Sequence, residues 1–295
     1  MTKPLGPLPS TLDPLAPLPG WIVHDSPQTL EDATFFAGAA LAHLHGVLRH
    51  PTLPRALLRA RLALAAAERV MVLTGRSERR AELRDALHLR RPGDAPGPAG
   101  EVLLCWSRAA ERAPSAESLA RALRGVPAEW IVLSLEADGP PIARAAAVLE
   151  AVLTQAPRAE TMALVLADAA LARALGWDAV VPLLGGALRR ADLAARGDDL
   201  RLACHKRLPS AVRMAVQEAL DLARRAERLK AVAPKLRTKG AGRVLELFLT
   251  QDALAPAALV HLLSDRAARR LCDRLVALDA IRELTGRDSF RLYGV

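Results

Sequence analysis

The stretch LSDRAARRLCDRLVALDAI, at positions 263–281, has the residue types and spacing of a helix that contacts DNA. Ser264 is a favoured N-cap residue, and small or apolar residues recur at helical spacing in the sequence that follows it. Four arginines occupy the other faces of this predicted helix: Arg266, Arg269, Arg270 and Arg274. Because a guanidinium group can donate paired hydrogen bonds to guanine or to a phosphate, these side chains predict contacts with double-stranded DNA.

Three further basic side chains lie in the segment PKLRTKGAG, at positions 234–242, which contains no acid. They are Lys235, Arg237 and Lys239. Four of the five lysines of the chain lie between Lys206 and Lys239, so an arginine-rich composition does not explain the cluster. A basic segment beside a small domain predicts contacts with DNA phosphates. An ordinary charged linker is the alternative.

A second candidate site for an anion is the sequence RRPGDAPGPAG, at positions 90–100. Its glycines and prolines predict a surface loop, because both residue types interrupt helices. Backbone amides beside Arg90 and Arg91 could hold an anion there. A plain connection between two helices is the alternative.

The arginine-rich helix needs neighbouring elements that hold it in position, and the sequence of residues 241–295 predicts such elements. One helix spans about 241–250, a second begins at Pro256, and the third spans 264–278. The short connection between the second and third helices fits a helix-turn-helix, whose second helix enters the major groove of DNA.

The sequences AIREL and SFRLYGV then predict two short strands joined by a turn at TGRD. We expect Arg287 at the tip of this hairpin, in contact with phosphates, and Phe290 and Leu292 facing the helices. Three helices followed by a hairpin are the order of a winged helix. Asp279 lies between helix and hairpin, where a residue that tolerates a left-handed backbone is needed.

The tail at positions 263–295 resembles the winged-helix tails of Fic-type proteins and of bacterial transcription regulators, which run from a capped helix into TGR and then R-x-Y. This chain departs from that pattern at Asp279, where glycine is usual. The stretches at 83–100 and 224–242, together with the tail, also resemble a bacterial family of unknown function. That second resemblance implies no activity.

The rest of the chain predicts helices. Ala and Leu are abundant and only 3% of the residues are aromatic, which favours a mainly all-α fold. Six prolines in the first 20 residues predict a disordered, proline-rich leader at 1–24. We expect an α-helical domain at 25–233, a basic linker at 234–240 and the winged-helix domain at 241–295. EWIVLSL, at 129–135, is the one segment with a strand-like apolar core, and it is too short to decide between strand and helix.

The charge of the chain is +9, from 41 basic and 32 acidic side chains, and it is uneven. Residues 53–92 contain ten arginines against four acids, and residues 221–295 contain 15 basic and 9 acidic side chains. Two basic regions on a near-neutral scaffold favour a polyanionic partner. An arginine-rich composition that follows from GC-rich coding is the alternative explanation.

No motif predicts catalysis or a cofactor. His43, His45 and His50 lie close in sequence, but on a helix His43 and His45 point about 200° apart, which excludes a shared metal ion. The sequence contains no nucleophile motif, phosphate-binding loop or dinucleotide fingerprint. Three separated cysteines and the absence of a long apolar run predict a cytoplasmic protein without disulfides.

The sequence therefore predicts a DNA-binding protein, either a regulator or a DNA-maintenance factor. A homodimer is expected because symmetric DNA sites are usually bound by dimers. The alternative is a winged-helix module that binds a protein in a chromosome- or plasmid-segregation complex. Asp273 favours this alternative, since it adds a negative charge to the predicted DNA-contacting face.

Overall fold

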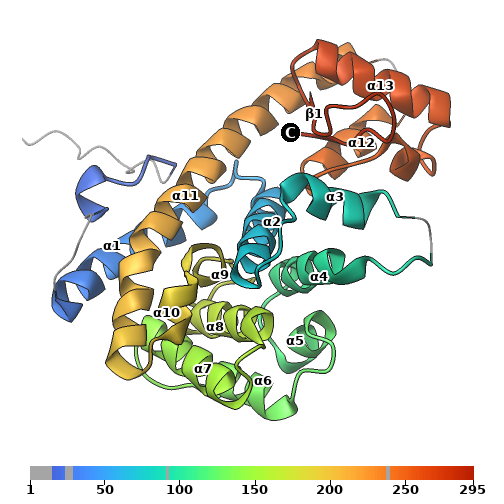
Figure 1. The fold of residues 1–295 in the computed structure, drawn as a ribbon. Coiled ribbons are helices and arrows are strands. Elements are labelled where there is room, and N and C mark those ends of the chain that lie inside the picture. The colour runs from blue at the N-terminus through green and yellow to red at the C-terminus, as the bar shows by residue number, and fades with distance from the viewer. Residues whose placement is uncertain (1–14, 24–28, 91–92, 237–239) are drawn as a thin grey trace, which may run out of the picture.

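The computed structural model describes residues 15–23, 29–90, 93–236 and 240–295, and these residues are mainly helical (Figure 1). A bundle of helices makes up the N-terminal part. Its elements are η1 (Gly20–Ile22), α1 (Leu30–Leu48), α2 (Arg55–Leu73), α3 (Arg80–His88), α4 (Gly97–Glu111), α5 (Ala116–Ala122), α6 (Ala128–Glu136), α7 (Pro141–Gln155), α8 (Glu160–Ala174), α9 (Leu184–Ala187), α10 (Arg190–Ala194), α11 (Gly197–Val232) and η2 (Ala233–Lys235).

Helix α8 lies at the centre of this bundle, with α6, α7 and α9 packed around it (Figure 1). Every residue from 163 to 172 is buried, which is the pattern of a helix enclosed on all sides. Asp168 is the one charged residue in that run. Its carboxylate accepts hydrogen bonds from the backbone N–H groups of Leu184 and Gly185, both at 2.9 Å, and so fixes the start of α9 to α8. Burial raises the pKa of Asp168 to about 7, against the effect of these hydrogen bonds.

Helix α11 is longer than the sequence predicts. The periodicity indicates a helix over 209–232, whereas the structure has a continuous helix of 36 residues that contains Pro209 in its interior. Proline lacks the N–H that would bond to the carbonyl of His205, so its presence favours an earlier helix end. Burial of Pro209 and of apolar residues on both sides of it compensates for that loss. Helix α11 packs on α1, α7 and α2 and then continues to the C-terminal end of the fold (Figure 1).

Two other segments differ from the sequence-based expectation. EWIVLSL lies in helix α6, where Trp130, Ile131 and Ser134 are buried at helical spacing. Part of the predicted disordered leader also packs on the core. Within the described residues 15–23, Ile22 is buried, and the Ala16 carbonyl lies 2.9 Å from Nε2 of His43. An apolar residue every few positions is sufficient to attach a proline-rich segment to the bundle.

We use the name C-terminal module for residues 240–295. It comprises α12 (Ala241–Phe248), the 3-10 helix η3 (Pro256–Leu259), α13 (Asp265–Ala277), β1 (Arg282–Glu283) and β2 (Tyr293–Gly294). The two strands are antiparallel, and an isolated bridge joins Leu254 to Tyr293. Buried side chains of α12 and α13 belong to the same continuous core as the helical bundle.

The module agrees with the expected order of elements and differs in detail. The second predicted helix is only a 3-10 helix followed by a turn. Asp279 adopts a φ of 53°, the left-handed conformation expected at this position. Leu292 is buried, but Phe290 is 74% exposed and does not face the helices. Phe290 has a φ of 54° and precedes β2, so the alternation of a strand does not apply to it.

The contact between α9 and α4 gives a stability prediction. A Cβ atom on Gly185 would lie 2.2 Å from Cη2 of the buried Trp106 ring. Gly185→Ala should therefore lower the free energy of unfolding by about 1–3 kcal/mol, because the indole must move within a closed core. Urea unfolding followed by circular dichroism measures the change.

Gly186→Ala is the matched control, since a Cβ atom there has nothing within 4 Å. Its stability should equal or slightly exceed that of the wild type, because alanine favours helix more than glycine does. Equal stability of the two variants would contradict the close contact at Gly185.

Candidate nucleic-acid interface

Helix α13 separates an apolar face from a basic face. The Ser264 hydroxyl caps its first turn by accepting a hydrogen bond from the N–H of Ala267 at 3.4 Å. Ala268, Leu271 and Leu275 are buried on the inner face. All four arginines that the sequence analysis predicts as DNA contacts on this helix are exposed: Arg266, Arg269, Arg270 and Arg274. The cap and the buried face therefore hold these guanidinium groups on one rigid support.

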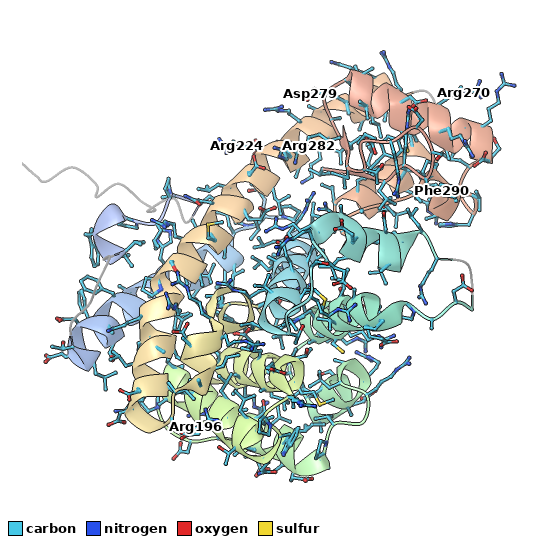
Figure 2. All side chains as sticks on the ribbon, viewed as in Figure 1. Arg196, Arg224, Arg270, Asp279, Arg282 and Phe290 are labelled. Carbon is cyan, nitrogen blue, oxygen red and sulfur yellow. The ribbon has the colours of Figure 1, made fainter. Side chains whose placement is uncertain are left out.

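Acidic groups neutralise only part of the basic face. Arg269 pairs with Asp265 at 3.0 Å, whereas Arg266, Arg270 and Arg274 form no ion pair with any described residue. Exposed Asp273 lowers the positive charge of the same helix. Figure 2 shows Arg270 at the outer end of α13, while the other end of the helix, near Asp279, meets α11.

The hairpin turns toward the helical bundle. Arg287 donates hydrogen bonds to both carboxylate oxygens of Asp85 on α3, at 2.8 and 2.9 Å. The sequence analysis predicts a phosphate contact for Arg287, and the structure instead pairs its side chain within the chain. This ion pair joins two segments 202 residues apart.

The remaining predicted basic residues are separate from α13 in the chain. Lys235 is exposed at the end of η2. Arg90 is exposed and donates to the Asp94 carbonyl at 3.0 Å, which orders its own loop. Arg91, Arg237 and Lys239 lie outside the described residues.

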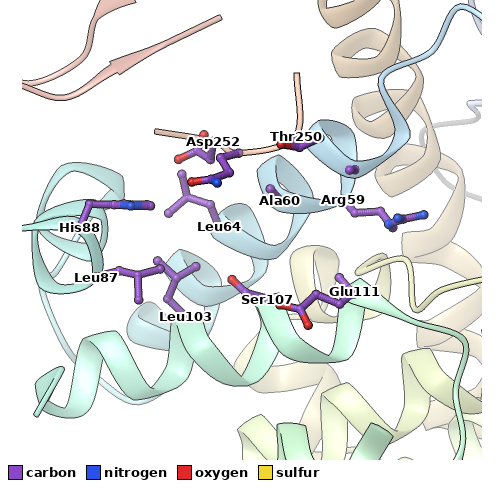
Figure 3. Close-up of a pocket in the computed structure, with 13 residues that line it drawn as sticks. Arg59, Ala60, Leu64, Leu87, His88, Leu103, Ser107, Glu111, Thr250 and Asp252 are labelled. Atoms are coloured by element: carbon purple, nitrogen blue, oxygen red, sulfur yellow. The ribbon is translucent and has the colours of Figure 1, made fainter. Parts of the chain in front are cut away.

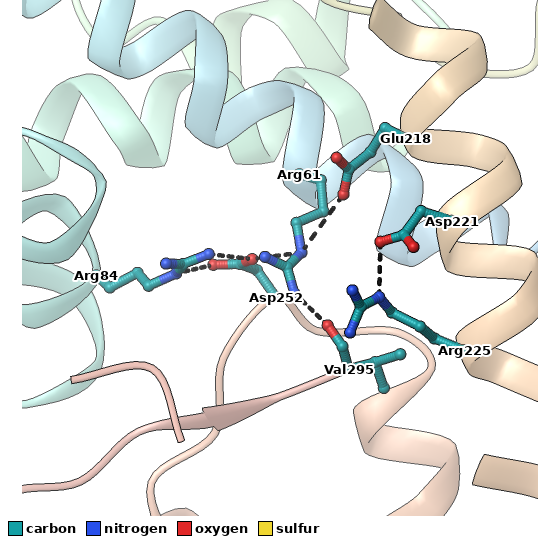
Figure 4. Close-up of polar contacts among 7 residues, drawn as sticks. All are labelled: Arg61, Arg84, Glu218, Asp221, Arg225, Asp252 and Val295. Atoms are coloured by element: carbon teal, nitrogen blue, oxygen red, sulfur yellow. Dashed lines mark hydrogen bonds and ion pairs between the residues drawn. The ribbon is translucent and has the colours of Figure 1, made fainter. Parts of the chain in front are cut away.

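A buried ionic cluster attaches the C-terminal module to the bundle (Figure 4). Asp252 is 8% exposed and accepts two hydrogen bonds from Arg84, at 2.6 and 3.0 Å. Nε of Arg61 lies 2.9 Å from the same carboxylate, and Arg61 also donates to the Val295 backbone oxygen at 2.7 Å. Glu218 on α11 lies 4.0 Å from Arg61. Helices α2, α3 and α11 thus meet the loop after α12 and Val295 at one point.

Electrostatics explains how a carboxylate can remain charged there. Burial alone would raise the pKa of Asp252, but the hydrogen bonds from Arg84 and the charge of Arg61 outweigh burial and hold the pKa below its usual 3.8. Sequence reasoning missed this cluster because Asp252 lies in a loop 168 residues from Arg84. Nothing in the local pattern distinguishes it from a solvated aspartate.

Beside this cluster lies a cavity of about 270 Å³ between α2, α3, α4 and the loop before η3 (Figure 3). His88, Ser107, Glu111 and Asp252 are among its lining residues. Burial lowers the pKa of His88. In the described part of the chain, no hydrogen bond joins Ser107 to His88, and the Asp252 carboxylate is already bound by arginines. The cavity therefore lacks the linked nucleophile and base of a hydrolytic triad.

The clustered histidines have structural partners. His43 contacts the Ala16 carbonyl, and His45 accepts a hydrogen bond from the Trp177 indole at 3.1 Å. Among the described residues, no three His, Cys, Asp or Glu side chains gather closely enough to hold a metal ion.

The comparisons place the chain in a family. The profile of the family described as "Protein of unknown function (DUF1403)" matches residues 8–295. The chain belongs to this family. A search of curated proteins finds no match. None of the helices in the described ranges combines the length and the hydropathy that crossing a membrane requires. The DUF1403 family description assigns no activity, so the function of this chain has to be argued from its geometry.

The ionic cluster gives a second stability prediction. Asp252→Asn should lower the free energy of unfolding by about 3–5 kcal/mol, because it leaves Arg84 buried without a counter-charge and Arg61 with only Glu218, 4.0 Å away. Asp221→Asn is the control, since Asp221 pairs with Arg225 at 2.6 Å in a much more exposed position. That change should cost at most about 1 kcal/mol. Equal losses in urea unfolding would show that the cluster does not depend on the charge of Asp252.

The wild type and Asp252→Asn should differ in how their stability responds to acid. Because the pKa of Asp252 is lower in the folded chain than in the unfolded chain, its stabilisation is present above about pH 4 and disappears as the pH falls through the folded-state pKa. Asp252→Asn should lose this acid-dependent part of the stability curve. An unchanged curve would contradict the lowered pKa.

Proposed function

We propose that this DUF1403 protein binds double-stranded DNA through the exposed face of α13, as a regulator or a DNA-maintenance factor. One observation carries the proposal. Arg266, Arg270 and Arg274 are exposed, form no ion pair with described residues, and project from a capped helix whose opposite face is fixed in the core. Free guanidinium groups on a rigid helix suit the major groove, which is wide enough to admit an α-helix.

The order of elements supports a winged helix-turn-helix for the C-terminal module. Helix α12, the 3-10 helix η3 and α13 are followed by the β1–β2 hairpin, and the Leu254–Tyr293 bridge adds a third short strand-like segment. The second helix of the proposed motif is shorter than usual. Its contact with α13 is nevertheless extensive, which fits its role as the support of a recognition helix.

The proposed contacts divide between bases and phosphates. Arg266 and Arg270 lie in the first half of α13, at the outer end of the module, and would contact base edges (Figure 2). Arg269 would exchange its ion pair with Asp265 for a contact with DNA. Arg274 and the basic segment that begins at Lys235 and includes Arg237 and Lys239 would contact phosphates. Arg287 would reach a phosphate only by leaving Asp85.

Fluorescence anisotropy of the full chain with labelled random duplex DNA, over a series of salt concentrations, tests the proposal. The wild type should bind with a steep salt dependence. On random DNA, which lacks a specific site, these two arginines would neutralise phosphates. Arg266→Ala combined with Arg270→Ala should therefore weaken binding and lower the slope of log K against log salt by about 2, roughly one unit for each lost phosphate contact.

Arg121→Ala combined with Arg158→Ala is the matched control, because these arginines are exposed, unpaired among the described residues and remote in sequence from α13. It removes the same charge and should leave binding nearly unchanged. Equal weakening by both double variants would show that binding depends on the net charge of the protein and not on α13. Absence of binding at low salt by a folded protein would overturn the proposal.

A protein-interaction module is the second candidate, as part of a chromosome- or plasmid-segregation complex. The observation that favours it is the exposure of large apolar side chains on the same module: Val260, Val276 and Phe290. Exposed apolar groups suit a protein surface better than a DNA backbone. In the anisotropy experiment, a folded chain that does not bind duplex DNA would favour this second function.

A further inference from the structure

We propose that a small organic phosphate binds in a cleft lined by arginines on the helical bundle, away from α13. The cleft has a volume of about 430 Å³ and lies between α2, the first residues of α3, α9, α10 and α11. Five arginines line it: Arg69, Arg79, Arg80, Arg189 and Arg207. This site is separate from the proposed DNA interface and does not depend on it.

The positive charge of the cleft is only partly compensated. Arg80 pairs with Glu68 at 2.9 Å, and Arg207 pairs with Asp192 at 2.8 Å. Arg69, Arg79 and Arg189 form no ion pair with any described residue. Three arginines without ion pairs give the hollow a net positive charge, which would attract an anion.

Arg69 provides the most specific sign of an occupant. Its Nε atom is buried and has no hydrogen-bond partner among the described residues. A buried donor without an acceptor is energetically unfavourable. An oxygen atom of a bound phosphate would supply that acceptor once the Arg69 side chain turns toward the cleft. Arginine suits this role better than lysine does, because its planar fork can donate two hydrogen bonds to one phosphate.

Backbone hydrogen bonds fix the main-chain positions of Arg79 and Arg189. The N–H of Arg79 donates to Glu82 at 3.0 Å, and the N–H of Arg189 donates to Asp192 at 2.8 Å. These bonds cap α3 and α10. Arg190 also donates to the Leu73 carbonyl at 2.7 Å, which ties α10 to the end of α2. The cleft is thus held in shape before any ligand arrives.

The remaining walls indicate a ligand with an apolar body. Val72 and Met214 line the same cleft and are 43% and 60% exposed, which is high for large apolar side chains. Gly186 also lines the cleft, and a Cβ atom there would meet nothing within 4 Å, so the space beside this residue is open. The volume lies in the range of small-molecule sites. A concave site of this size suits a phosphorylated nucleoside better than a duplex.

Isothermal titration calorimetry of the full chain with ADP, pyrophosphate and adenosine tests the proposal. ADP and pyrophosphate should bind, and ADP should bind more tightly if its body contacts Val72 and Met214. Adenosine alone should bind much more weakly. Arg69→Gln should weaken ADP binding by at least about tenfold, because it removes charge-assisted hydrogen bonds. Arg121→Gln, an equal charge change on α5, should leave binding unchanged.

A second variant blocks the cleft without changing its charge. Gly186→Leu places a side chain in this open space and should abolish ADP binding, with cooperative urea unfolding showing that the fold is retained. The proposal is overturned if ADP and pyrophosphate do not bind to the folded wild type, if adenosine binds as tightly as ADP, or if both cleft variants bind normally.

Duplex DNA provides the last comparison. Arg69→Gln should leave duplex binding at its wild-type strength, whereas the α13 variants should leave ADP binding unchanged. A loss of DNA binding in Arg69→Gln equal to that in the α13 variants would assign the cleft to DNA and overturn the small-ligand proposal.

Discussion

The fold depends on one buried carboxylate shared by two arginines. Asp252 belongs to the C-terminal module, while Arg61 and Arg84 belong to different helices of the bundle, so a single charged group fixes three segments. Removing a carboxylate from water is costly, and only two guanidinium groups in contact make that burial favourable. The module therefore cannot shift on the bundle without exposing an uncompensated charge. The hairpin of the module also faces the bundle, because Arg287 pairs with Asp85 on α3. The basic face of α13 is therefore left exposed.

A second buried acid organises the centre of the bundle. Asp168 holds the start of α9 against α8, and Gly185 lets Trp106 pack directly on that backbone. The position of α9 in turn fixes the part of the arginine-lined cleft to which Gly186 contributes. Both acids work through hydrogen bonds in the buried interior, where such bonds are strong. Asp252 binds side chains and Asp168 binds backbone N–H groups, and each acid joins elements that periodicity alone cannot place together.

The sequence predicts local structure here better than it predicts contacts. Helical periodicity and the Ser264 cap locate α13, and its arginines are exposed as expected. The first part of α11 could not be predicted, because Pro209 locally favours a helix end and only tertiary packing keeps the helix continuous. The partners of Asp252 are distant in the chain, and no pattern within one element reveals them. The arginine-rich segment 53–92 supplies three of the five arginines that line the cleft, although composition cannot show that three of the five form no ion pair with described residues.

Helix α11 connects the bundle to the C-terminal module as one continuous element. With 36 residues it is about 54 Å long, and it reaches from the region of α10 to the C-terminal module (Figure 1). Arg207, near one end, lines the cleft, whereas Arg228, near the other, donates to Asp279 at the end of α13. Because the Asp252 cluster attaches the module to the bundle at a second point, the helix holds the cleft and α13 at a set separation.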